Sequence, residues 1–68
     1  MNGGVFVMKI YKLTAYESKG KVIIDESVEA ANDEEAKQKG QAMLEEKDLL
    51  ETTHRLASPT GQLILFHS

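Results

Sequence analysis

Residues 32–47 read NDEEAKQKGQAMLEEK, and this segment has the pattern of one amphipathic helix. Asn32 is a preferred N-cap residue, and Glu35 follows it at the spacing of a capping box. Small and apolar residues then recur along one helical stripe, namely Ala36, Gly40, Met43 and Leu44. We therefore predict a helix from about Asn32 to Lys47. Because glycine weakens a helix interior by about 1 kcal/mol relative to alanine, Gly40 is expected to mark a close approach to a sheet.

Two strand patterns precede this helix and predict a hairpin. Apolar and polar residues alternate over residues 9–16, residues 17–20 have the composition of a turn, and a β-branched run extends over residues 22–28. An even-numbered loop is expected, because an odd one would turn Asp25 and Ser27 towards the core. The face expected to be buried then consists of Tyr11, Leu13, Ala15, Val22, Ile24 and Val28.

A second hairpin is predicted after the helix. Residues 53–57 have the pattern of a short polar strand, residues 58–61 read SPTG and suit a turn, and residues 62–67 form an apolar run. This last strand is apolar on both faces, which is typical of a strand that is covered on both sides. We therefore expect it in the centre of the sheet.

The predicted fold class is thus α+β, with the order β-β-α-β-β and one helix packed on a four-stranded sheet. The preferred strand order is 2-1-4-3, with the two central strands parallel, and the alternative is the antiparallel order 2-1-3-4. Residues 1–68 are expected to form a single small domain. Residues 1–7 are expected to be a loose N-terminal extension, which makes Met8 an equally acceptable start.

The composition argues against several classes of protein. The chain has no cysteine, so disulfides and thiolate zinc sites are ruled out. Its longest apolar runs are far shorter than the roughly 20 residues that span a bilayer, so no membrane association is expected. The net charge of −3 disfavours a dedicated nucleic-acid binder. No nucleophile motif, phosphate-binding loop or facing pair of carboxylates occurs, so we expect neither enzyme activity nor a cofactor.

Four short strings resemble a known family. Residues 32–40 read NDEEAKQKG, residues 53–55 THR, residues 58–61 SPTG and residues 63–67 LILFH, and these strings are similar to those of the YhzD-like family of small Bacillus proteins. The resemblance covers residues 8–68. It implies a soluble cytoplasmic protein, and it supplies no activity and no catalytic signature.

The two histidines are the only candidates for a metal site. The expected turn pairs His54 with Leu65, which places His67 diagonally beside His54 on one face of the sheet. A metal site needs three or four ligands, and no suitably spaced carboxylate joins the pair. We therefore expect two partly exposed imidazoles and no bound metal.

The apolar residues on the helix-free face lead to the main functional hypothesis. If Leu63 and Leu65 point inward, the candidate interface consists of Ile10, Tyr16, Ile23, Ile64 and Phe66. A contiguous exposed apolar patch usually marks an interface, so we expect a non-enzymatic interaction module that forms a homodimer through its sheet or binds another protein. The alternative is a weak nucleic-acid or anion-binding protein, whose candidate residues are Lys12, His54, Arg55 and His67.

Overall fold

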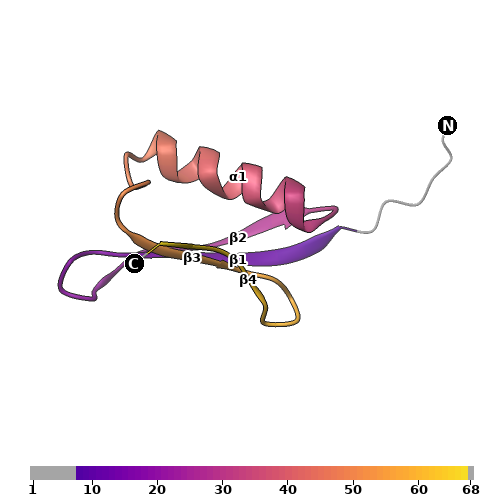
Figure 1. Cartoon of the computed structure of the whole chain (residues 1–68), viewed down its shortest axis with the longest axis horizontal. Coiled ribbons are helices and arrows are strands. Elements are labelled where there is room, and N and C mark those ends of the chain that lie inside the picture. The colour runs from indigo at the N-terminus through magenta and orange to yellow at the C-terminus, as the bar shows by residue number, and fades with distance from the viewer. Residues whose placement is uncertain (1–7, 68) are drawn as a thin grey trace, which may run out of the picture.

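One helix and four strands make up the computed structural model, which describes residues 8–67. In chain order the elements are β1 (Lys9–Tyr16), β2 (Val22–Ala30), α1 (Asp33–Glu46), β3 (Thr53–Ala57) and β4 (Leu63–His67). The helix covers one face of the sheet and leaves the other face uncovered (Figure 1). This confirms the α+β class and the β-β-α-β-β order. The predicted loose extension, residues 1–7, lies outside the described residues.

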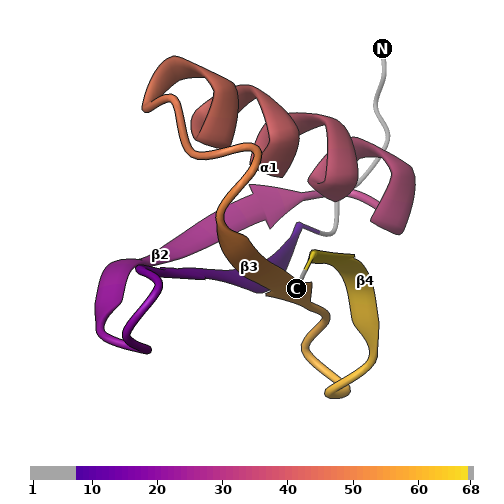
Figure 2. The ribbon, with the colours of Figure 1, turned by 60° about the vertical axis from the view of Figure 1, so that its left-hand side comes forward.

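The strands lie in the order β2-β1-β3-β4, and every neighbouring pair is antiparallel. The alternative order 2-1-3-4 is therefore correct, and the preferred order 2-1-4-3 with parallel central strands is wrong. The short connection after α1, residues 47–52, brings β3 beside β1. The tight turn after β3 keeps β4 next to β3, and β1 already occupies the other side of β3. The apolar strand β4 is therefore an edge strand (Figure 2).

The predicted helix is confirmed to within one residue at each end. Asn32 is the N-cap, and its side-chain oxygen accepts a hydrogen bond from the Glu35 backbone N–H at 2.8 Å. The Glu35 carboxylate in turn accepts from the Ala31 N–H at 2.6 Å, so two backbone donors are satisfied at this end. Three acidic residues occupy the first turn, where the positive end of the helix dipole stabilises them.

The predicted stripe faces the sheet. Ala36, Gly40 and Leu44 are buried, and Met43 is half-buried against the core. A Cβ atom built on Gly40 would lie 3.3 Å from Cδ2 of Leu56 on β3, which is a tight contact. The absence of a side chain at Gly40 therefore lets α1 approach the sheet closely, as the sequence predicted.

We predict that Gly40→Leu lowers the free energy of unfolding by about 1–3 kcal/mol, because the larger side chain overpacks the contact with Leu56. Thermal and denaturant unfolding of the purified variant measure the effect. Gln41→Leu, at the exposed neighbouring position, is the matched control and should leave stability nearly unchanged. Equal stabilities of the two variants would contradict the close approach.

A register shift in the first hairpin alters one predicted core position. The shift lies between Ala15 and Tyr16, so that Ala15 pairs with Ile24 and Tyr16 pairs with Val22. Ile24 is buried, as predicted, but Val22 is 50% exposed. The prediction that Val22 lies in the core is wrong, because a bulge inserts one unpaired residue and reverses the faces beyond it.

A second shift, between Leu56 and Ala57, alters the other hairpin. Ala57 pairs with Leu63 and Leu56 pairs with Leu65, so Ile64 is the extra residue on β4. The strand therefore turns Leu63 away from the core, and Leu63 is exposed instead of pointing inward.

The core lies between α1 and the covered face of the sheet. It consists of Tyr11, Leu13, Ala15, Ile24, Val28, Ala30, Ala36, Leu44 and Leu56. The Tyr11 hydroxyl donates a hydrogen bond to Oδ1 of Asp33 at 2.6 Å, which ties β1 to the first turn of α1. This hydrogen bond to a carboxylate, together with the burial of the ring, raises the pKa of Tyr11 from 10.0 to about 12.

The raised pKa of Tyr11 predicts a loss of stability at high pH. The neutral hydroxyl stabilises the folded chain fully below pH 10, and this contribution is lost as the pH rises through about 12. The difference in unfolding free energy between the wild type and Tyr11→Phe should therefore be constant below pH 10 and shrink above it. Urea unfolding at a series of pH values measures it. Asp33→Asn, which removes the carboxylate charge, should weaken the pH dependence, and a difference that stays constant up to pH 12 would contradict the prediction.

Candidate functional site

The uncovered sheet face is ordered into rows, because paired residues on antiparallel strands project to the same face. Two rows cross the whole sheet from β2 to β4. The first consists of Ser27, Lys12, Ala57 and Leu63, and the second of Asp25, Thr14, Arg55 and Phe66. Ile10 pairs with Glu29 at one end of these rows, and Tyr16 pairs with Val22 at the other end.

Most of the predicted interface residues do lie on this face. Ile10 and Phe66 are exposed there, and Tyr16 is half-buried. Ile23 is also exposed, but it is the extra residue of the β2 bulge and no pairing with β1 fixes its face. Ile64 differs, because the bulge turns it against the core, where it is half-buried. Sequence reasoning missed Val22 and Leu63 on the exposed face, since neither bulge has a signature in the sequence.

The apolar residues occupy the margins of this face and not its centre. Phe66 and Leu63 lie along β4, and Val22 lies at the hairpin end of β2. A polar band crosses between them, in which Lys12 Nζ lies 2.7 Å from Oδ1 of Asp25. Polar side chains therefore divide the apolar surface, which is richest at the β4 margin, and the interface stays a prediction.

The four candidate anion-binding residues are split between the two faces of the sheet. Lys12 and Arg55 are on the uncovered face, where the Arg55 guanidinium carbon lies 5.8 Å from the centre of the Tyr16 ring. His54 pairs with Ala15, a core residue, so His54 and its partner His67 are on the covered face. The structure does not bring the four side chains together.

The two histidines form a stacked pair. Their ring centres are 5.4 Å apart, with an interplanar angle of 28°. The predicted pairing of His54 with Leu65 is wrong, because the β4 bulge makes His54 pair directly with His67. The expected partial exposure of His54 is also wrong. It is 4% exposed, and its Nδ1 donates to the Thr52 carbonyl oxygen at 2.9 Å.

This geometry assigns His54 to packing. Among residues 8–67 no group of three or more His, Cys, Asp or Glu side chains is arranged to hold a metal ion. The absence of metal binding stays a prediction that solution experiments can test.

We predict that His54→Ala lowers the free energy of unfolding by roughly 1–3 kcal/mol, because it leaves a cavity and removes the bond to Thr52. His67→Ala, at an exposed position, should have a much smaller effect. Thermal unfolding with and without added zinc measures the stability of each variant and any stabilisation by the metal. A zinc-dependent rise in melting temperature that the double variant loses would overturn the packing role.

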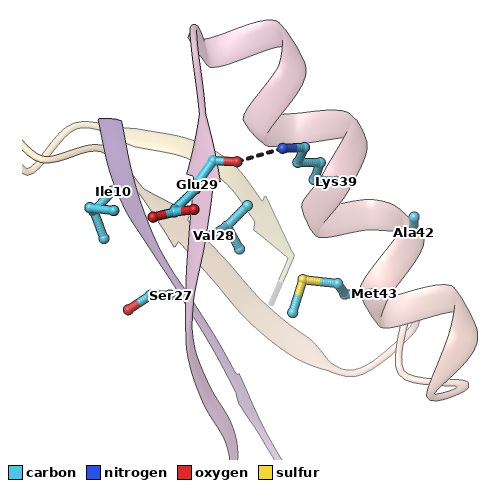
Figure 3. Close-up of a pocket in the computed structure, with 7 residues that line it drawn as sticks. All are labelled: Ile10, Ser27, Val28, Glu29, Lys39, Ala42 and Met43. Atoms are coloured by element: carbon cyan, nitrogen blue, oxygen red, sulfur yellow. Dashed lines mark hydrogen bonds between the residues drawn. The ribbon is translucent and has the colours of Figure 1, made fainter. Parts of the chain in front are cut away.

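A second surface feature is a groove along the edge strand β2, with α1 on one side of it, which we call the β2 groove (Figure 3). Its volume is about 700 Å³. The lining residues are Ile10, Ser27, Val28, Glu29, Lys39, Ala42 and Met43. Lys39 Nζ spans the groove and donates to the Glu29 backbone carbonyl at 2.7 Å. No sequence pattern indicated this groove, because it depends on how far α1 lies from the margin of the sheet.

Comparisons with known proteins add a family to these features. The chain matches the YhzD-like protein family over residues 8–68. A Bacillus subtilis (strain 168) protein described as "Uncharacterized protein YhzD" is 45% identical over 60 residues, which cover 88% of this chain and 98% of the relative. No solved structure matches the chain. Within residues 8–67, α1 is too short and too polar to cross a membrane.

Proposed function

The chain belongs to the YhzD-like family, and we propose that it is a non-enzymatic interaction module that self-associates through the uncovered face of its sheet. One observation carries the proposal. Phe66 is 55% exposed and Leu63 is 50% exposed on the same strand, and no helix within residues 8–67 covers them. Exposed apolar side chains gathered on one surface are the usual mark of an interface.

The small core gives a thermodynamic reason for association. Three of its nine members are alanines, which contribute little apolar area. A chain of 68 residues without disulfides buries a modest fraction of its surface and is marginally stable alone. Burying Phe66 and Leu63 between two copies would add apolar contacts that the single chain lacks.

The register supports a second copy as the partner. A two-fold axis across the strands, midway between the two central rows, lays Leu63 of each copy over Phe66 of the other. The same operation lays Lys12 over Thr14 and so keeps like charges apart. Face-to-face packing at about 10 Å between sheets would then bury the β4 margins of both copies.

The anion-binding alternative has less support. Only Lys12 and Arg55 of its four candidates share the uncovered face, and both already have neighbours, since Lys12 pairs with Asp25 and Arg55 lies near Tyr16. The cytoplasmic location implied by the family resemblance is part of the proposal, in keeping with a chain that lacks cysteine.

We predict that Phe66→Glu abolishes self-association while preserving the helix signal in circular dichroism. The buried carboxylate that it would place at the interface is strongly unfavourable. Sedimentation equilibrium at high micromolar concentration should give about twice 7.6 kDa for the wild type and a single copy for the variant. Leu50→Glu, at an exposed apolar position outside the sheet, is the matched control and should remain dimeric. A wild type that sediments as a 7.6 kDa monomer would overturn the proposal.

A further inference from the structure

We propose that the β2 groove binds an extended peptide, which adds a fifth strand along the free edge of β2 and alternates apolar with basic side chains. This site lies at the margin of the sheet opposite to β4 and goes beyond self-association.

The backbone of β2 offers unpaired hydrogen-bonding groups in the groove. Within residues 8–67, β1 is the only strand hydrogen-bonded to β2. The Glu29 carbonyl accepts from Lys39 on the side away from β1, and alternate residues of a strand direct their backbone groups to the same side. The N–H and C=O groups of Ser27 and Asp25 therefore face the same free edge, and they are a template for an added strand.

The two walls of the groove differ in chemistry, which fixes the pattern of the peptide. On the α1 side lie Val28, Ala42 and Met43, whereas the Glu29 carboxylate projects to the other side of β2 (Figure 3). Successive side chains of an added strand point to these two sides in turn. Apolar side chains would therefore contact the α1 wall, and the Lys39 ammonium disfavours basic side chains there. Basic side chains would meet Glu29.

Charge also favours a basic peptide over a second copy of the chain as the occupant of the β2 groove. The two ion pairs in the described part of the chain join Lys12 to Asp25 and Lys47 to Glu26, so neither involves the Glu29 carboxylate. Two antiparallel copies of β2 centred on Ser27 would set Asp25 of one against Glu29 of the other, which is unfavourable for like charges. A basic side chain on the partner strand would pair with the Glu29 carboxylate, whereas a second copy would place Asp25 against it.

Fluorescence anisotropy with labelled seven-residue peptides tests the proposal. The probe is VKVKVKV, and the controls are VEVEVEV and a VKVKVKV variant with proline in place of the central lysine, which removes a backbone donor together with one positive charge. We expect saturable binding of the probe and roughly tenfold weaker binding of both controls. Equal binding of the proline peptide would overturn strand addition, and no binding of the probe would overturn the site.

A charge reversal locates the contact. Glu29→Lys should reverse the preference, so that VEVEVEV binds more tightly than VKVKVKV. Glu51→Lys is the matched control, because it makes the same change in net charge at an exposed position after α1 and should keep the wild-type preference. If both variants bind VKVKVKV equally weakly, general attraction to an acidic chain explains the binding, and the proposed contact with Glu29 is wrong.

The two proposals can fail separately. The β2 groove is formed within one copy, so a folded Phe66→Glu variant should bind the probe at least as tightly as the wild type does. Loss of peptide binding in a folded Phe66→Glu variant would overturn a groove that acts in a single chain.

Discussion

The contact between Gly40 and Leu56 sets the distance between the two layers of this protein, and most of its other features depend on that distance. With no side chain at Gly40, the backbone of α1 comes close to the side chains of Leu56 on β3 and Leu13 on β1. Only one helix is present in residues 8–67, so the covered face receives the whole core. The other face is left to the solvent or to a partner, and the position of α1 over the sheet also defines the β2 groove.

Local features were predictable because local chemistry determines them. The helix ends follow from the Asn32 cap and from the stripe that includes Gly40, and both signals come from residues that are close together in the sequence. The limits of β3 and the approximate limits of β4 follow in the same way from the SPTG turn between them.

The strand order was not predictable from the same patterns. A strand that is apolar on both faces is typical of a central position, but β4 is an edge strand. The apolar side chains of β4 therefore reflect exposure at the margin of the sheet and not burial at its centre. The two bulges had no signature either, because a single unpaired residue changes the faces of Val22 and Ile64 without any change in composition. The β2 groove is a tertiary feature, so hydrophobic periodicity does not report it.

The two edges of the sheet differ in how they are protected. On β2, Lys39 occupies one backbone carbonyl, and acidic side chains such as Glu29 oppose pairing with another copy. On β4, from Leu63 to Phe66, no charged side chain is present, and the bulge at Ile64 interrupts the regular spacing of backbone groups. Acidic side chains therefore hinder pairing at the β2 edge, whereas the bulge hinders pairing at the β4 edge.

The central position of β3 has a consequence for how the chain folds. Both hairpins and the helix are made of contacts close in sequence, but the β1–β3 seam joins Lys12 to Ala57, 45 positions later. Closing so long a loop is entropically costly, and non-local pairing of this kind slows folding. The edge of β1 that faces β3 therefore stays unpaired until residues 53–57 reach it. The C-terminal hairpin is therefore the segment whose arrival completes the sheet.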